Sequence, residues 1–381
     1  APTQPPAPTA TKGPVKGGAF KDSTFADAVS LQPLLTNDSA STNYQGLIYT
    51  APLRRDPFTL KLVGNLYDGE PTLSSDGSVV TWKLKKGIKW SDGTPITSAD
   101  IVFTWQKMMD EKVKFLLRTL YKDAITDVTA PDPETVVFKM AKPGFCPAID
   151  YTGFSIIPKH IYEKLDINQN DVNDKPTVTN GLFKFKEWVK DDHVTASPSY
   201  KDFIRGEPLL DSYTYRVVKD NTVRTQMFKT QDVDFAAPDP IDVDELKKLP
   251  FANFVHYYSP TGGYTYIGIY PGNTPFLADK KVRQALTLAI NRQEMVDKII
   301  LGYGKPLDSF LHAANWAYSD DVPKFPYDAA KAKQMLKEAG FTPGPDGILQ
   351  KDGKPFKIRI FYNAGNKVRE QISVIAQQYL K

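Results

Sequence analysis

The stretch 76–105, DGSVVTWKLKKGIKWSDGTPITSADIVFTW, constrains the local fold of this chain more than any other. Its apolar runs at 79–84 and 88–90 are separated by a glycine and bounded by Asp-Gly turns, a pattern typical of β-strands. Thr97 stands three residues before Asp100 and just ahead of an apolar run, and this spacing predicts a capping box at a helix start. Because three of the five tryptophans lie in this stretch, we expect a local hydrophobic core here.

The size and charge of the chain narrow its class. With 381 residues it is too long for one simple core, so two lobes are expected. Its 48 basic and 44 acidic residues are mixed along the sequence and leave a net charge of +4. This balance gives no electrostatic case for nucleic acid or an anionic membrane as the main partner. A single cysteine excludes an intrachain disulfide and a thiolate metal cluster.

Hydrophobic periodicity predicts the order of elements along the chain. The helix that starts near Thr97 is expected to continue through Met109 towards Leu120. From residue 264 onward the order is strand, helices, strand and helix, with strands at 264–270 and 356–362. Such a βαβα order is expected to build a sheet covered by helices.

Recognised catalytic patterns are missing from the sequence. The four histidines are far apart and in no metal-ligand spacing, and no GxSxG, P-loop or GxGxxG motif occurs. We therefore expect no catalytic residues, no metal and no cofactor, and the sequence supports no enzyme. Aromatic and small polar residues instead cluster in loops, as they do along the walls of ligand clefts.

Four blocks carry a resemblance to a known family. LKKGIKWSDGTPITSADIVFTW at 84–105 is followed in order by TNGLFKFKEW at 179–188, FLADKKVRQALTLAINRQEMV at 276–296 and YDAAKAKQMLKEAGF at 327–341. Together they resemble the extracellular solute-binding proteins of the oligopeptide/dipeptide type (family 5, cluster C). Members of this family are the binding components of ABC importers.

The resemblance implies an α/β, two-lobed fold of the periplasmic-binding-protein type II class with an extra subdomain in lobe I. Residues 1–17, rich in Pro, Thr and Ala, are expected to be a disordered tether. Lobe I is expected at 18–262, with the extra subdomain at 48–176, and lobe II at 263–381. Lobe II is longer in the family, so an incomplete second lobe is expected here.

The matching blocks also imply ligand-binding residues. Their implied roles are backbone hydrogen bonding, close approach to the ligand and aromatic walls of a cleft between the lobes. Gly262 and Gly263 are implied as hinge residues that let the lobes close. The implied ligand-binding residues are Asn43, Tyr44, Asn180, Gly181, Tyr264, Tyr266 and Trp316.

The implied function is non-catalytic capture of short peptides and their delivery to an ABC permease in the membrane. The implied protein is a monomer at the outer face of the cell membrane or in the periplasm, lipid-anchored through a removed N-terminal segment. Alternatives with the same fold are binding of an oligosaccharide, a metal chelate such as a nickel complex, an opine-like compound or another small solute. A surface hydrolase, and an adhesin or signalling receptor without a transporter, are alternatives from other classes.

Overall fold

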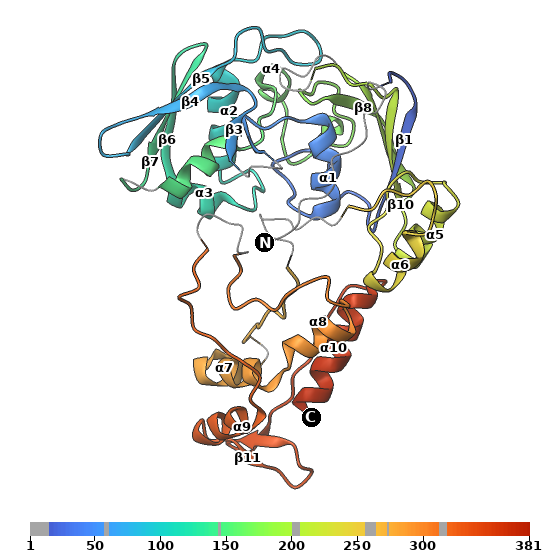
Figure 1. Ribbon diagram of the computed structural model, residues 1–381. Helices are drawn as coiled ribbons and strands as arrows, with labels where there is room; N and C mark the ends of the chain where they lie inside the picture. The colour runs from blue at the N-terminus through green and yellow to red at the C-terminus, as the bar shows by residue number, and fades with distance from the viewer. Residues whose placement is uncertain are drawn as a thin grey trace. The chain divides into compact units, whose positions relative to one another are not determined.

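The computed structural model describes residues 15–56, 61–143, 146–199, 206–255, 264–272, 274–311 and 318–381. These residues form two compact units (Figure 1). Unit 1 comprises the described residues up to Lys219, together with Asp232–Phe235. Unit 2 comprises Asp220–Gln231 and the described residues from Ala236 to Lys381.

Unit 1 contains a four-stranded mixed sheet in the order β1-β10-β9-β8. β1 pairs with β10 in parallel, and the other neighbours are antiparallel. Helix α1 packs on β8 and β9 of this sheet, and its buried face joins a small apolar core with the strands (Figure 1). The bounds are β1 Ala19–Thr24, α1 Ser39–Ile48, β8 Phe183–Val189, β9 His193–Pro198 and β10 Ser212–Val217.

The second sheet of unit 1 is antiparallel, in the order β4-β5-β7-β6. Helices α2 and α3 pack on it and enclose a core that includes all three tryptophans of the stretch 76–105. The bounds are β4 Tyr67–Leu73, β5 Val79–Leu84, α2 Ser98–Met109, α3 Arg118–Ala124, β6 Ile125–Asp132 and β7 Thr135–Met140. Around it lie β2 Leu53–Arg55, β3 Leu62–Gly64, η1 Cys146–Gly153, α4 Lys159–Tyr162 and η2 Asp171–Asn173.

The predicted capping box opens α2. The backbone N–H of Thr97 donates to the Asp100 carboxylate at 3.0 Å, and the Thr97 side chain accepts from the third helical residue in return. The other oxygen of Asp100 accepts from the N–H of Lys159 at 3.0 Å, so this local cap also fixes the start of α4.

The predicted continuation of this helix towards Leu120 is wrong, because α2 ends at Met109. The Arg118 guanidinium donates to the carbonyls of Met108 at 3.0 Å and Asp110 at 2.7 Å. Carbonyls near the end of the helix thus find partners in a side chain, and the chain can turn before α3 begins.

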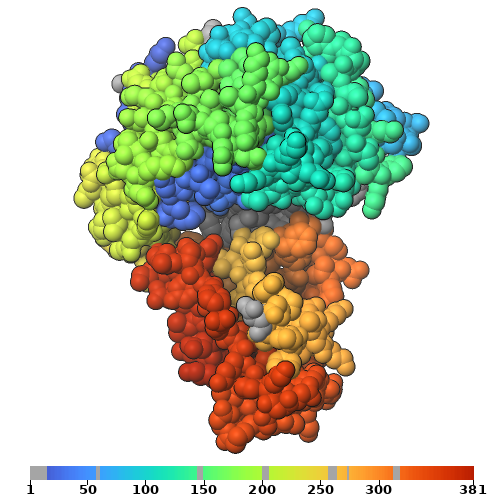
Figure 2. Space-filling view, turned by 180° about the vertical axis from the view of Figure 1, so that it is seen from behind, coloured from blue at the N-terminus to red at the C-terminus, as the bar shows by residue number. Residues whose placement is uncertain are grey.

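Segments far apart in sequence meet on one face of unit 1. In Figure 2 the surface of residues near 155–165 lies against that of residues near 100–110. The Thr104 hydroxyl accepts from the N–H of Ile157 at 3.1 Å, deep in the core. Long-range bonds of this kind attach α2 to the segment that leads to the loop at 179–181.

Unit 2 is built mainly of helices. α7 packs on α9 around an apolar cluster that includes Ala285 and Phe341, and α8 and α10 share a second cluster around Ala376. The helices are α5 Asn221–Lys229, η3 Pro240–Asp242, α6 Val243–Leu246, η4 Pro275–Ala278, α7 Lys280–Ala289, α8 Arg292–Lys298, α9 Ala329–Glu338 and α10 Lys367–Leu380. A three-stranded sheet contains β11 Thr342–Pro343, β12 Leu349–Lys351 and β13 Lys354–Pro355.

The expected strands at 264–270 and 356–362 are not formed in the described part of unit 2. Both segments carry exposed aromatic residues: Tyr266 is 72% exposed and Phe361 is 82% exposed. A strand forms only when a neighbouring backbone supplies its hydrogen-bond partners, and among the described residues neither segment pairs with another strand.

The predicted lobe boundary at 262 lies in a stretch, 256–263, outside the described residues. The described residues 220–231 and 236–255 group with unit 2, and the lobe boundaries drawn from the resemblance remain a prediction. Among the helices that the structure describes, none has the length and apolar character needed to cross a membrane.

Candidate functional site

Helix α1 positions the first two candidate residues on different faces. The Asp38 carboxylate caps the helix by accepting from the N–H of Ser41 at 2.9 Å. Asn43 points to solvent, whereas Tyr44 is only 1% exposed. The Tyr44 ring packs edge-on against Tyr215 of β10 at 5.1 Å between centroids. Of these two neighbours in sequence, only Asn43 offers its side chain to solvent in unit 1.

Asn180 and Gly181 lie against the C-terminal end of α1. The Asn180 amide accepts from the N–H of Thr50 at 2.9 Å and donates to the carbonyl of the same residue at 3.0 Å. The N–H of Gly181 donates to the carbonyl of Ile48 at 2.7 Å. The structure therefore brings Asn180 and Gly181 together with the helix that carries Tyr44, through backbone-directed hydrogen bonds.

Gly181 is required by space. A Cβ at this position would lie 2.4 Å from the carbonyl carbon of Ile48 and 2.5 Å from the carbonyl oxygen of Leu47. The close approach expected at this glycine is thus an approach to α1 in the described structure. Two residues upstream, Thr179 exchanges two hydrogen bonds with Ser91 of the turn ahead of α2, at 2.8 and 3.0 Å.

Sequence reasoning missed a tyrosine–aspartate cluster formed by Asp22, Tyr44, Tyr213 and Tyr215. The Tyr213 hydroxyl donates to the Asp22 carboxylate at 2.8 Å and lies 3.5 Å from the Tyr215 hydroxyl. Burial raises the pKa of Asp22 above its ordinary value, although the hydrogen bonds from Tyr213 and from the N–H of Ser23 act in the opposite direction. Burial, reinforced by nearby acidic groups, also raises the pKa of Tyr44 well above its ordinary value.

The cluster had a signal in the sequence. Phe20, Asp22 and Thr24 alternate with exposed residues in β1, so a carboxylate occupies the inward row of a strand. The hydroxyls of Thr24 and Tyr44 are buried and have no hydrogen-bond partner among the described residues. Buried polar groups normally have partners, and small polar cavities often hold water. The cluster thus offers hydrogen-bonding groups beneath α1.

The remaining candidates belong to unit 2 or lie outside the described residues. Tyr264 and Tyr266 are 43% and 72% exposed, and their ring centroids are 5.5 Å apart. They form an exposed aromatic pair of the kind that a ligand wall needs. Trp316 and the hinge candidates Gly262 and Gly263 lie outside the described residues.

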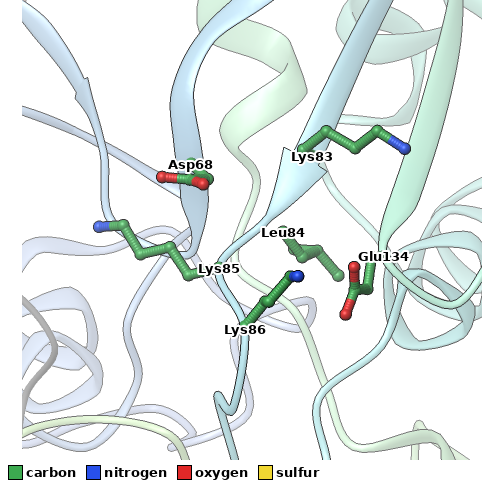
Figure 3. Close-up of a pocket in the computed structure, with 6 residues that line it drawn as sticks. All are labelled: Asp68, Lys83, Leu84, Lys85, Lys86 and Glu134. Carbon is green, nitrogen blue, oxygen red and sulfur yellow. The ribbon is translucent and has the colours of Figure 1, made fainter.

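A separate depression of about 490 Å³ opens on the surface of unit 1, lined by Asp68, Lys83, Leu84, Lys85, Lys86 and Glu134. Lys83 and Lys85 extend in opposite directions (Figure 3). Lys85 donates to the backbone carbonyls of Gly64 at 3.1 Å and Asn65 at 2.8 Å. Five of its six lining residues are charged, whereas a small-molecule pocket is lined mainly by hydrophobic and aromatic side chains.

Histidine and acidic side chains form no metal site in the part of the chain that the structure describes, since no three of its His, Cys, Asp and Glu residues converge. His160 binds Asp92 at 2.9 Å, and His193 binds Asp192 at 2.9 Å. Each of these two histidines thus has a carboxylate partner. His160 links α4 to the turn ahead of α2, whereas His193 bonds its neighbour in sequence.

Comparisons with known proteins place this chain. Residues 61–381 match the family model of the bacterial extracellular solute-binding proteins, family 5 Middle. The chain is 34% identical over 379 residues to the oligopeptide-binding protein AppA of Bacillus subtilis, covering 97% of this chain and 68% of that protein. It is 31% identical over 327 residues to the glutathione-binding protein GsiB of Salmonella choleraesuis, covering 85% of this chain and 60% of that protein.

The solved structure of AppA from Bacillus subtilis in complex with a nonapeptide superimposes with a TM-score of 0.86 at 31% identity. The superposition covers 96% of this chain and 73% of the AppA chain. This chain therefore spans between three fifths and three quarters of the length of these relatives. This fold and these sequence matches agree with the four blocks that carried the resemblance. The chain belongs to the family 5 bacterial extracellular solute-binding proteins.

Proposed function

We propose that this protein is the binding component of an ABC importer and captures short peptides for delivery to a membrane permease. The observation that carries the proposal is the 34% identity to an oligopeptide-binding protein along 97% of this chain. The match to AppA bound to a nonapeptide and the relation to a glutathione-binding protein, which takes a tripeptide-sized ligand, support a peptide as the ligand class.

The exposed tyrosines of unit 2 support a direct role in ligand contact. Tyr264 and Tyr266 leave much of their ring surface free, and large aromatic side chains contribute strongly to binding when a ligand buries them. We propose that they form an aromatic wall, with Trp316 as a further wall residue. Asn43 is proposed to supply hydrogen bonds from the solvent-facing side of α1.

The structural roles of Tyr44, Asn180 and Gly181 refine this proposal. Their described contacts are internal to unit 1, so they are proposed to shape the ligand site by holding the end of α1 and the 179–181 loop. Closure of the two lobes about Gly262 and Gly263 belongs to the same proposal. A monomeric state and attachment to the membrane through a lipid belong to it as well.

Isothermal titration calorimetry against a panel of di-, tri- and nonapeptides tests the proposal, with a nickel–histidine complex and an oligosaccharide as competing ligand classes. We expect binding of at least one peptide class at micromolar Kd or tighter. Tight binding of the nickel complex or the sugar with no peptide bound would overturn the peptide assignment. Native mass spectrometry of the purified protein would identify a ligand that copurifies.

A matched pair of tyrosine variants tests the aromatic wall. Tyr266→Ala is expected to weaken peptide binding about tenfold, as loss of a buried aromatic contact does. Tyr270 is 74% exposed at the far end of the same segment, so Tyr270→Ala removes equal surface and is expected to leave the affinity within twofold of wild type. Equal effects of the two variants would contradict a specific wall at Tyr266.

A further inference from the structure

One arginine joins three separate stretches of unit 2. Arg292 is the first residue of α8, and its side chain is 30% exposed. Its guanidinium donates to the carbonyl of Leu307, to the Asp308 carboxylate at 2.9 Å and to the carbonyl of Phe325 at 2.9 Å. A single side chain thus binds both ends of the segment between residues 308 and 325.

A second cation reinforces this closure. Lys324 lies 3.7 Å from the carboxylate of Asp308, across the same two ends of the segment. The hydrogen bond from Arg292 holds the pKa of Asp308 below its ordinary value, so the carboxylate stays ionised at neutral pH. We call this set of contacts among Arg292, Leu307, Asp308, Lys324 and Phe325 the loop neck.

The chain beyond the neck is fixed to the helices. The N–H of Asp328 donates to the carbonyl of Leu288 in α7 at 2.8 Å, and the Asp328 side chain caps α9 by accepting from the N–H of Lys331 at 2.8 Å. The neck therefore stands on a rigid base formed by α7, α8 and α9. Residues 308 and 325, at the two ends of the segment, are thus both attached to that base.

The described part of this loop carries two aromatic residues. Phe310 is 70% exposed, and Tyr318 is half-buried, with its hydroxyl donating to Asp320 at 2.6 Å. Exposed aromatics on a loop whose ends are fixed can meet a partner at a small entropic cost, because the loop is already ordered at its base. Aromatics on a loop open at its base would have to be ordered on binding.

We infer that Arg292 is a positioning residue for ligand capture, closing the loop neck so that Phe310 and Tyr318 are held ready for the ligand. This role rests on the proposed peptide-binding function. It requires the planar guanidinium fork, because three acceptors in different directions are served by one head group. A lysine at the same position has a compact ammonium and cannot span all three.

Three variants of the full chain test this role by hydrogen–deuterium exchange of the loop and by binding kinetics with the peptide found in the panel. Arg292→Met removes all three bonds. Arg292→Lys keeps the charge without the fork. Arg283→Met is the matched control, because the Arg283 guanidinium donates to the carbonyls of Leu277 and Ala278, at 2.9 and 2.8 Å, without touching the loop.

With Arg292→Met we expect amide exchange at 309–311 and 318–324 to rise at least tenfold and peptide affinity to fall about tenfold. The loss corresponds to charge-assisted hydrogen bonds that no longer close the neck. Arg292→Lys should lie between wild type and Arg292→Met in both measurements. Arg283→Met should leave loop exchange and affinity at the wild-type values.

Unchanged loop exchange in Arg292→Met would overturn the neck. Faster exchange with wild-type affinity would overturn its role in ligand capture. An equal loss of affinity in Arg283→Met would show a general effect on unit 2 and would also overturn the role. A wild-type protein that binds no peptide would overturn the proposed function and this role together, and the exchange rates would still decide whether Arg292 closes the neck.

Discussion

Replacing Gly181 by alanine is expected to destabilise unit 1 by about 3 kcal/mol. The added Cβ would lie 2.4 Å from the carbonyl carbon of Ile48, a distance that side-chain rotation cannot relieve because the obstacle is backbone. Overpacking typically costs about 1–3 kcal/mol, and a clash with backbone belongs at the upper end of that range. Shifting the backbone also weakens the 2.7 Å bond from Gly181 to Ile48, worth about 1 kcal/mol. The smaller entropy of the unfolded alanine chain offsets about 0.5–1 kcal/mol.

Gly46, in the last turn of α1, provides the matched control. Nothing lies within 4 Å of a Cβ built at Gly46, and the residue is helical and exposed. Gly46→Ala is therefore expected to stabilise unit 1 by about 0.5–1 kcal/mol through helix propensity. The same chemical change, made within one helix and at the loop against its end, should thus have opposite signs.

Urea unfolding followed by tryptophan fluorescence measures both changes. Four of the five tryptophans, Trp82, Trp90, Trp105 and Trp188, belong to unit 1, so the signal reports chiefly on that unit. With an m-value of about 3 kcal/mol/M, Gly181→Ala should lower the urea midpoint by about 1 M and Gly46→Ala should raise it by about 0.2–0.3 M. The steric argument would be refuted if the urea midpoint of Gly181→Ala differed from that of wild type by less than about 0.3 M, which is the size of the shift expected for Gly46→Ala.

Three further predictions concern side chains of unit 1. Asn180→Ala should destabilise the unit by about 2 kcal/mol, because the backbone N–H and carbonyl of Thr50 both lose the Asn180 amide as a partner. Urea unfolding measures this loss of stability, and a loss below about 0.5 kcal/mol would contradict a stabilising role of these two hydrogen bonds. Burial raises the pKa of Asp22 above 3.8, so the stability of unit 1 should fall as pH rises from 3.8 through that raised pKa. Asp22→Asn should abolish this pH dependence of the melting temperature. An unchanged pH dependence in Asp22→Asn would contradict the assignment to Asp22. Hydrogen bonds, first from the Ser74 hydroxyl, lower the pKa of the exposed Asp76 to about 2. The stabilising contribution of the Asp76 carboxylate should therefore persist above pH 3.8 and be lost as pH falls through about 2. Carbon NMR titration should show a higher pKa for Asp76 in Ser74→Ala, and an unchanged pKa would exclude that hydrogen bond as the cause.

Local structure around residues 76–105 was predictable because its causes are local. The capping box depends on two side chains three residues apart, Thr97 and Asp100, and both halves form. The burial of Trp82, 3% exposed, follows from a strand with an apolar inward row. The strand expected at 88–90 is reduced to a single bridge between Lys89 and Pro95, and Trp90, 1% exposed, is buried outside the strands. The end of α2 was missed because it depends on Arg118, whose guanidinium returns from the next helix to meet the final carbonyls.

The contacts made by the candidate site residues were not predictable from the sequence. Sequence marks Tyr44 and Asn180 as an aromatic and an amide near loops, which suits a ligand wall. The structure shows that Tyr44 is 1% exposed and that the amide of Asn180 bonds to Thr50, 130 residues away in sequence. No local pattern reveals such a partner, because the contact exists only after the chain has folded.

The sequence alone determined the family, the capped helix at Thr97, the tryptophan-rich core and the main helices of unit 2, since periodicity and capping act over a few residues. Tertiary structure alone decided that the carboxylate of Asp22 lies buried beneath α1, that Arg292 closes a loop neck, and that 264–270 finds no strand partner among the described residues. These features depend on which distant backbone or side chain is brought within hydrogen-bonding distance. A hydrogen bond of about 3 Å between residues far apart in the chain is set by the packing of whole elements, and that packing is not written in any short stretch.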